Sequence, residues 1–90
     1  MKLSAKQRQD LRSKAHSLKP VVIIGAKGVT KTVLRELEVS IKFHELIKVK
    51  IAGSDKDDRK KASDYLCSYL KCELIQSIGN ILILYKENIN

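Results

Sequence analysis

The chain has 90 residues, 43% of them hydrophobic, which indicates one small domain over residues 1–90 with a modest core. It starts without an apolar signal segment and has no apolar run near the roughly 18 residues of a membrane span, so we expect a cytoplasmic protein. The formal net charge is +8, and residues 1–31 alone carry eight basic side chains against one acidic side chain, a bias that favours a polyanionic partner.

The first predicted elements are a helix and a strand. Ser4 and Gln7 have the spacing of a capping box, so we expect a helix over about residues 4–16. Pro20 ends any preceding helix, and Val21 to Ile24 predict a strand; because this strand is apolar at every position, we expect both its faces to be covered. The apolar stripe of the helix consists of Leu11, Ala15 and Leu18.

A second helix and strand follow. Thr30 is a suitable N-cap for a helix over about residues 31–43. Polar and apolar residues then alternate over Glu45–Ala52, which is typical of a half-buried strand and places Lys48 and Lys50 on the same face. The apolar stripe of this helix consists of Val33, Leu34, Leu37 and Ile41.

The last third predicts a helix and a hairpin. Asp55 can cap a helix that runs to about residue 70. Glu73–Ile78 and Ile81–Tyr85 flank the two-residue turn Gly79-Asn80, a favoured hairpin connection. The predicted buried stripe of the helix consists of Ala62, Tyr65, Leu66, Tyr69 and Leu70, so the two tyrosines are expected in the core and its rim rather than on a base-stacking surface.

These elements give the order α-β-α-β-α-β-β. A right-handed crossover makes the first two strands parallel, whereas the hairpin makes the last two antiparallel. We therefore predict an α/β fold with a mixed four-stranded sheet packed with three helices.

The cysteines and histidines do not suggest a metal or catalytic centre. Cys67 and Cys72 are too few for a disulfide framework, and His16 and His44 are far from both in sequence. We expect the cysteines to act as small apolar side chains near the core. No catalytic residue, metal site or cofactor is predicted.

The stretch PVVIIGAKGVTKT, residues 20–32, is similar to a phosphate-binding P-loop but departs from it. Gly25, Lys31 and Thr32 fit the pattern, whereas Thr30 occupies the position of the glycine that lets backbone amides wrap the phosphates. No later apolar strand ends in an aspartate suited to hold Mg²⁺. We therefore disfavour a nucleotide-hydrolysing or phosphotransfer enzyme.

A G-x-x-G loop describes the same stretch better. Gly25-Ala26-Lys27-Gly28 joins a strand to the N-terminus of a helix, where free amides and the helix dipole favour anions. Lys27 and Lys31 add positive charge at this position. KH domains hold an RNA backbone with a loop of this composition, although theirs joins two helices.

Three segments resemble those of the YhbY-type proteins, the single-domain form of the CRM (chloroplast RNA splicing and ribosome maturation) domain. They are LKPVVIIGAKGVT at 18–30, HELIKVKI at 44–51 and IGNILILYK at 78–86. The resemblance covers about residues 3–86. It implies an RNA-binding fold similar to the C-terminal domain of translation initiation factor three, and association with precursors of the large ribosomal subunit. It also implies that Gly25, Ala26, Lys27 and Gly28 contact RNA.

We therefore expect a monomeric, non-enzymatic protein that binds ribosomal RNA during assembly of the large subunit. With one phenylalanine, three tyrosines and no tryptophan, we expect recognition of shape and backbone rather than base stacking. The alternative is an adaptor whose basic face meets an acidic protein. The predicted RNA-binding residues are Gly25, Ala26, Lys27, Gly28, Lys31, Lys19, Arg8, Arg12, Lys14, Lys48 and Lys50.

Overall fold

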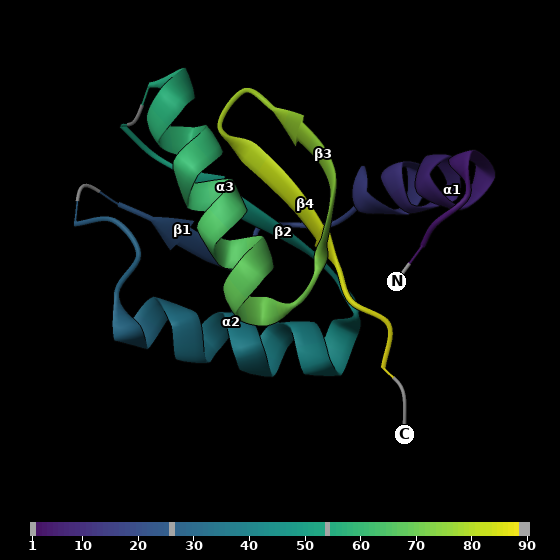
Figure 1. The fold of residues 1–90 in the computed structure, drawn as a ribbon, viewed down its shortest axis with the longest axis horizontal. Coiled ribbons are helices and arrows are strands. Elements are labelled where there is room, and N and C mark those ends of the chain that lie inside the picture. Colours follow the sequence, from purple (N-terminus) through teal and green to yellow (C-terminus); the bar gives the residue numbers. More distant parts are fainter. Residues whose placement is uncertain (1, 26, 54, 89–90) are drawn as a thin grey trace.

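The computed structural model describes residues 2–25, 27–53 and 55–88, and its element order confirms the prediction (Figure 1). Three helices alternate with the first strands, and a hairpin closes the chain. The elements are α1 (Ala5–Ala15), β1 (Val22–Ile24), α2 (Lys31–His44), β2 (Leu46–Ile51), α3 (Lys56–Leu70), β3 (Glu73–Ile78) and β4 (Ile81–Tyr85).

Each helix begins at the cap that the sequence predicts. The backbone N–H of Gln7 donates to Ser4 Oγ at 3.1 Å, and the Ser4 N–H donates to Gln7 Oε1 at 2.8 Å, which completes the capping box. Thr30 accepts a hydrogen bond from the backbone of α2, and Asp55 accepts one from the backbone of α3. Short-range hydrogen bonding therefore sets where each helix starts.

The four strands form one mixed sheet in the order β1-β2-β4-β3. β1 pairs with β2 in parallel, and the other two pairings are antiparallel, so the predicted sheet is confirmed. Two backbone hydrogen bonds tie the connections together at one end of the sheet: Ala52 N–H donates to the Ile24 carbonyl and Ile51 N–H to the Asn80 carbonyl, both at 2.8 Å. The glycine-containing loop after β1 thus leaves the sheet at the same end as the β3–β4 turn, with the end of β2 between them.

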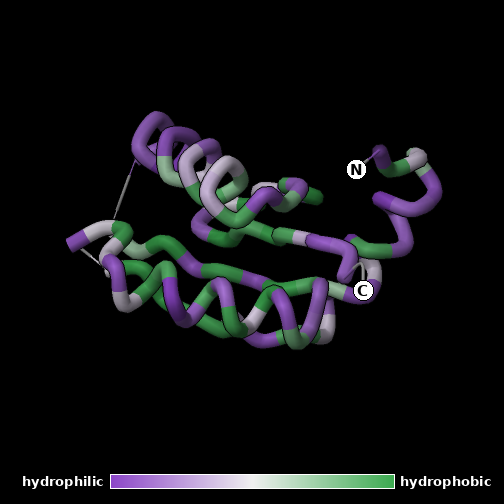
Figure 2. Tube along the Cα trace, turned by 60° about the horizontal axis from the view of Figure 1, so that its bottom comes forward, coloured by the Kyte–Doolittle hydropathy of each residue, from purple (hydrophilic) through white to green (hydrophobic). Residues whose placement is uncertain are grey.

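The two faces of the sheet are covered unequally. α2 and α3 pack on one face and bury the main core, whereas α1 packs on the other face over a smaller cluster formed by Ala15, Ile75 and Ile83. Figure 2 shows hydrophobic residues concentrated in the strands and along α2, while α1 and α3 are largely hydrophilic. The main core comprises Val22, Ile24, Leu34, Leu37, Ile41, Ile47, Val49, Ile51, Leu66, Leu70, Cys72, Leu82 and Leu84.

The expectation that β1 is covered on both faces is wrong. Ile23 in the middle of this strand is 63% exposed, whereas its neighbours Val22 and Ile24 are buried. β1 lies at the edge of the sheet, and α1 contacts β2 and β3 instead. The face of the sheet on which α1 packs, which we call the outer face, is therefore open beside β1.

The tyrosines of α3 lie at the rim of the core rather than within it. Tyr65 is 50% exposed and Tyr69 47% exposed, so neither contributes a fully buried ring. Glu38 on α2 accepts a hydrogen bond from the Tyr69 hydroxyl and raises the pKa of this tyrosine. The cysteines agree with the expectation, since Cys72 belongs to the main core and Cys67 packs against it.

Replacing Lys71 with glycine is expected to stabilise the protein by about 0.5–1 kcal/mol. Lys71 ends α3 with φ 54° and ψ 49°, a left-handed conformation that costs a residue with a Cβ but not glycine. Urea unfolding of Lys71→Gly checks this value. Lys61→Gly in the middle of α3 is the control and should lower the free energy of unfolding by about 1 kcal/mol. A less stable Lys71→Gly variant would contradict the argument.

Candidate nucleic-acid interface

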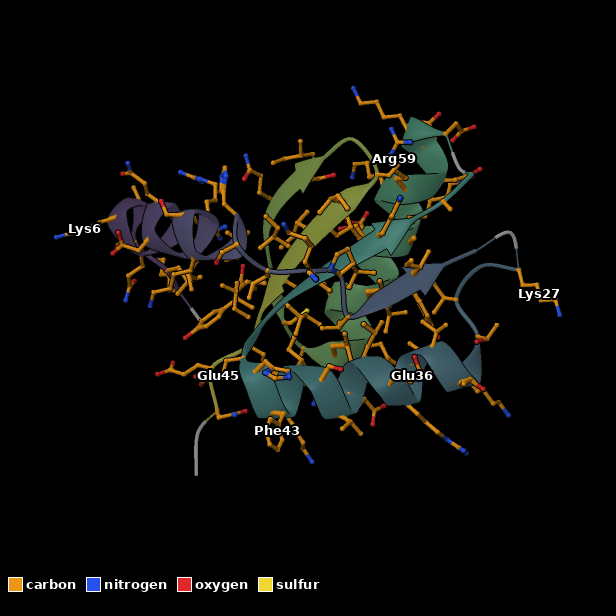
Figure 3. The ribbon with its side chains drawn as sticks, turned by 180° about the vertical axis from the view of Figure 1, so that it is seen from behind. Lys6, Lys27, Glu36, Phe43, Glu45 and Arg59 are labelled. Atoms are coloured by element: carbon orange, nitrogen blue, oxygen red, sulfur yellow. The ribbon has the colours of Figure 1, made fainter. Side chains whose placement is uncertain are left out.

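The glycine loop is an open turn between β1 and α2. Gly28 N–H donates to the Gly25 carbonyl at 3.0 Å, and Gly28 has φ +75°, a conformation that side chains disfavour. A Cβ placed on either glycine would meet no atom within 4 Å. Ala26 lies outside the described residues. Figure 3 shows Lys27 pointing from this loop away from the body of the protein. The described residues of the loop thus present their backbone to solvent beside the exposed side chain of Lys27.

α2 begins two residues after the loop and adds a second source of positive potential. Thr30 caps the helix, and the first turn contains no acidic residue. Lys31, its first residue, is exposed. The unpaired amides and the dipole at a helix N-terminus attract anions. Arg35, which the sequence analysis did not select, is exposed one helical turn after Lys31 and extends the cationic side of α2.

Three other predicted lysines line a groove at the opposite end of β1 from the loop. Lys14 comes from the end of α1, Lys19 from the α1–β1 connection and Lys48 from β2. The groove has a volume of about 420 Å³. Its other lining residues are Leu11, Leu18, Val21, His44, Glu45, Leu46, Ile47 and Tyr85. We call this site the α1–β2 groove.

Lys50 lies between the α1–β2 groove and the glycine loop. It follows Lys48 by two positions on β2, so both side chains project from the same face, about 7 Å apart. In the sheet, Lys50 pairs with Ile23 on one side and with Ile81 on the other. The open part of the outer face thus carries a lysine between the α1–β2 groove and the predicted glycine loop.

The two arginines of α1 are placed differently. The Arg8 guanidinium donates to Glu73 Oε2 and to the Leu74 carbonyl, both at 3.2 Å, so it ties α1 to β3 and is partly neutralised. Arg12 is half-buried on α1. Neither lines the α1–β2 groove. A structural role of Arg8 was not foreseen, because Glu73 lies 65 residues away in sequence.

Tyr85 and His44 are groove residues that the sequence analysis did not assign to a site. Burial, together with the carboxylates of Glu45 and Glu87, raises the pKa of Tyr85, so its hydroxyl stays protonated at neutral pH. Both residues fall in segments that resemble the YhbY-type proteins, HELIKVKI and IGNILILYK. That overlap was the signal available in the sequence.

Metal chemistry has no evident support in the part of the chain that the structure describes. There, no three His, Cys, Asp or Glu side chains are grouped so that they could hold a metal ion. The same residues include no helix long and apolar enough to cross a membrane. The notable features of the surface are thus its lysines, the bare loop and the groove.

Comparison with known proteins identifies the family. The model of the CRS1 / YhbY (CRM) domain matches residues 3–86. The chain belongs to this family. A Pseudomonas aeruginosa relative, named a probable RNA-binding protein, is 43% identical over 98% of this chain and 85% of its own length. A Haemophilus influenzae relative, named an RNA-binding protein, is 44% identical over 96% of this chain and 87% of its own.

The same fold is also seen in a solved structure. The solution structure of a hypothetical Staphylococcus aureus protein superposes with a TM-score of 0.85 at 31% sequence identity. The match covers 99% of this chain and 93% of the other. The predicted α/β fold with three helices and a mixed four-stranded sheet is therefore confirmed.

Proposed function

We propose that this CRM-domain protein binds RNA without catalysing a reaction, and that its target is ribosomal RNA in precursors of the large ribosomal subunit. Relatives from two bacteria that match nearly the whole chain are named as RNA-binding proteins, one of them as a probable one. The CRM family to which the chain belongs is a family of RNA-binding domains rather than of enzymes. On this proposal the protein acts as a cytoplasmic monomer.

One observation carries the proposal: a bare, solvent-facing loop at the N-terminus of α2. Among the described residues, none except the chain neighbours comes within 4 Å of the Cβ position of Gly25 or Gly28, so a sugar-phosphate chain can approach the backbone closely. The Gly28 and Val33 amides are already engaged, with the Gly25 carbonyl and with Thr30 Oγ1. We therefore expect phosphate oxygens to bond the first amides of α2, before Val33, while Lys27 and Lys31 add charge. A duplex or a folded RNA presents such phosphates whatever its sequence.

The other predicted lysines extend this contact along the outer face of the sheet. Along the outer face from the glycine loop, Lys50 lies first and the lysines of the α1–β2 groove lie beyond it. Because Arg8 already bonds Glu73, we expect it to contribute less to RNA affinity than the lysines. The six lysines of the proposed track are Lys14, Lys19, Lys27, Lys31, Lys48 and Lys50.

The salt dependence of binding tests this proposal. If the six lysines each neutralise one phosphate, the logarithm of the association constant should fall with the logarithm of salt with a slope of about −4 to −5. Fluorescence anisotropy with a labelled ribosomal RNA fragment between 50 and 300 mM salt measures this slope. Affinity that stays flat over that range would contradict phosphate-dominated binding.

Copurification separates the RNA-binding proposal from an adaptor that contacts an acidic protein. An RNA-bound protein should lose its ribosomal partners when the lysate is treated with nuclease, whereas an adaptor should keep them. Sequencing of crosslinked RNA then identifies the segment bound. The enzymatic alternative predicts Mg²⁺-dependent nucleotide binding, which isothermal titration calorimetry would detect; we expect no such binding.

A further inference from the structure

The α1–β2 groove is lined by apolar and aromatic residues as well as by lysines. Its walls come from four parts of the chain: the end of α1 with the following connection, the end of α2 with Glu45, the start of β2, and Tyr85 at the end of β4. A volume of about 420 Å³ is within the range of small-molecule sites, roughly 300–1,000 Å³. It lies on the outer face of the sheet, away from the main core under α2 and α3.

The lining combines an apolar floor with aromatic rings and cations. Leu11, Leu18 and Val21 supply aliphatic surface, of which Leu18 is 37% and Val21 40% exposed. Tyr85 and His44 supply rings of the kinds on which unstacked bases pack. The three cations at the rim are Lys14, Lys19 and Lys48.

A single carboxylate, that of Glu45, lies among the lining residues, and it is already engaged. The Asn88 backbone N–H donates to its Oε2 at 2.7 Å. The groove therefore offers apolar and aromatic surface next to three lysines, none of which forms a salt bridge within the part of the chain that the structure describes. A nucleotide combines a flat base with a charged phosphate, so it matches this surface in both respects. An acidic peptide would match the lysines but not the rings.

The backbone at the edge of the groove is held in a strained conformation. Glu45 connects α2 to β2 with φ 63° and ψ −48°, which is rare for a residue other than glycine. Its N–H donates to the Ile41 carbonyl at 3.0 Å and its carbonyl accepts from Lys86 N–H at 2.9 Å. Strain that the surrounding hydrogen bonds maintain is typical of binding sites. The backbone conformation of Glu45 sets the positions of its neighbours His44 and Leu46.

We propose that the α1–β2 groove binds one unpaired nucleotide of the RNA whose backbone crosses the glycine loop. The base packs between the aliphatic floor and Tyr85, and the adjoining phosphates contact the three lysines. β1 is three residues long and spans about 10 Å between the α1–β2 groove and the glycine loop. Lys50 pairs with Ile23 in the middle of β1, so it lies between these two sites. This inference rests on the proposed function and narrows its target to an RNA with a bulged or looped nucleotide near a backbone segment. It departs from the expectation of recognition without base stacking, because the fold brings Tyr85 into the groove.

Two RNA hairpins test the inference: one fully paired, and one with the same stem and a single unpaired nucleotide. The wild-type protein should bind the second hairpin at least tenfold more tightly. Leu18→Glu, which puts a carboxylate on the floor of the groove, should reduce this preference to twofold or less. Ser13→Glu adds the same charge at an exposed position of α1 outside the groove and should keep the preference.

The outcomes separate the two proposals. Equal wild-type affinity for both hairpins would overturn the nucleotide site and leave the RNA-binding proposal intact. Failure to bind either hairpin would overturn both. Amide chemical shifts of the labelled protein give a second readout: Lys19, Leu46 and Lys48 should shift with the unpaired hairpin only. Shifts confined to Lys27 and Gly28 would overturn the groove assignment.

Discussion

Gly25→Asp is expected to lower RNA affinity at least tenfold while the unfolding temperature stays unchanged. Gly25 is exposed, its φ is not in the left-handed region, and a Cβ there has open space, so aspartate causes no strain. The new carboxylate occupies the place of a phosphate and repels the RNA backbone next to the α2 N-terminus. Fluorescence anisotropy and a thermal melt followed by circular dichroism measure the two quantities.

Gly25 is a better position for this test than Gly28. A side chain at Gly28 would have to adopt φ +75°, so a loss of affinity there would combine strain with lost contacts. Ser68→Asp is the matched control, because it makes the same change of charge at an exposed position of α3 and should leave affinity within about twofold. A folded Gly25→Asp variant that binds RNA as tightly as the wild type would remove the loop from the mechanism.

Most of the fold could be predicted because its signals are local. The capping box of Ser4 and Gln7 involves residues three apart, and the alternation around Lys48 and Lys50 is complete within six residues. The turn Gly79-Asn80 sets the pairing of the last two strands by its length alone. Each of these features is decided within one element or turn, so one sequence suffices to find it.

The errors concern contacts between distant parts of the chain. The sequence around Ile23 predicts a buried strand residue. Its exposure arises because β1 lies at the edge of the sheet and α1 docks elsewhere. α1 docks through the apolar cluster of Ala15, Ile75 and Ile83 and through the hydrogen bonds of Arg8 with β3, which join residues more than 60 positions apart. No periodicity within a segment encodes such an arrangement. Apolar composition alone therefore overstated how much of β1 is covered.

The candidate site shows the same division. The glycine loop is contiguous in sequence, so residues 25–28 could be proposed from their spacing. The α1–β2 groove joins Lys14, Lys48 and Tyr85, which are separated by 34 and 37 positions. The sequence indicated Lys14 and Lys48 from charge but not that they share a groove, nor that an aromatic ring lies beside them. Their grouping follows from the register of β2 with β4, which brings Tyr85 next to the start of β2, and from the docking of α1 on the sheet, which brings Lys14.

The double variant Lys27→Gln with Lys31→Gln is expected to bind RNA about thirtyfold more weakly at physiological salt. Each exposed contact with a phosphate is worth about 1 kcal/mol, and two such losses give this factor. The slope of the logarithm of the association constant against the logarithm of salt should also become less steep by about 1.5, because two fewer counterions are displaced. Salt titrations of both proteins by fluorescence anisotropy give the affinities and the slopes together.

Lys2→Gln with Lys6→Gln is the control, since it removes the same two charges near the N-terminus. Figure 3 shows Lys6 and Lys27 at opposite ends of the molecule, and neither Lys2 nor Lys6 lies on the proposed track. Its slope should equal that of the wild-type protein within about 0.5, because exposed charges beyond a Debye length of about 8 Å interact little with the bound phosphates. If both variants changed the slope equally, RNA would be responding to the overall charge of the protein, and the loop lysines would have no special place in binding.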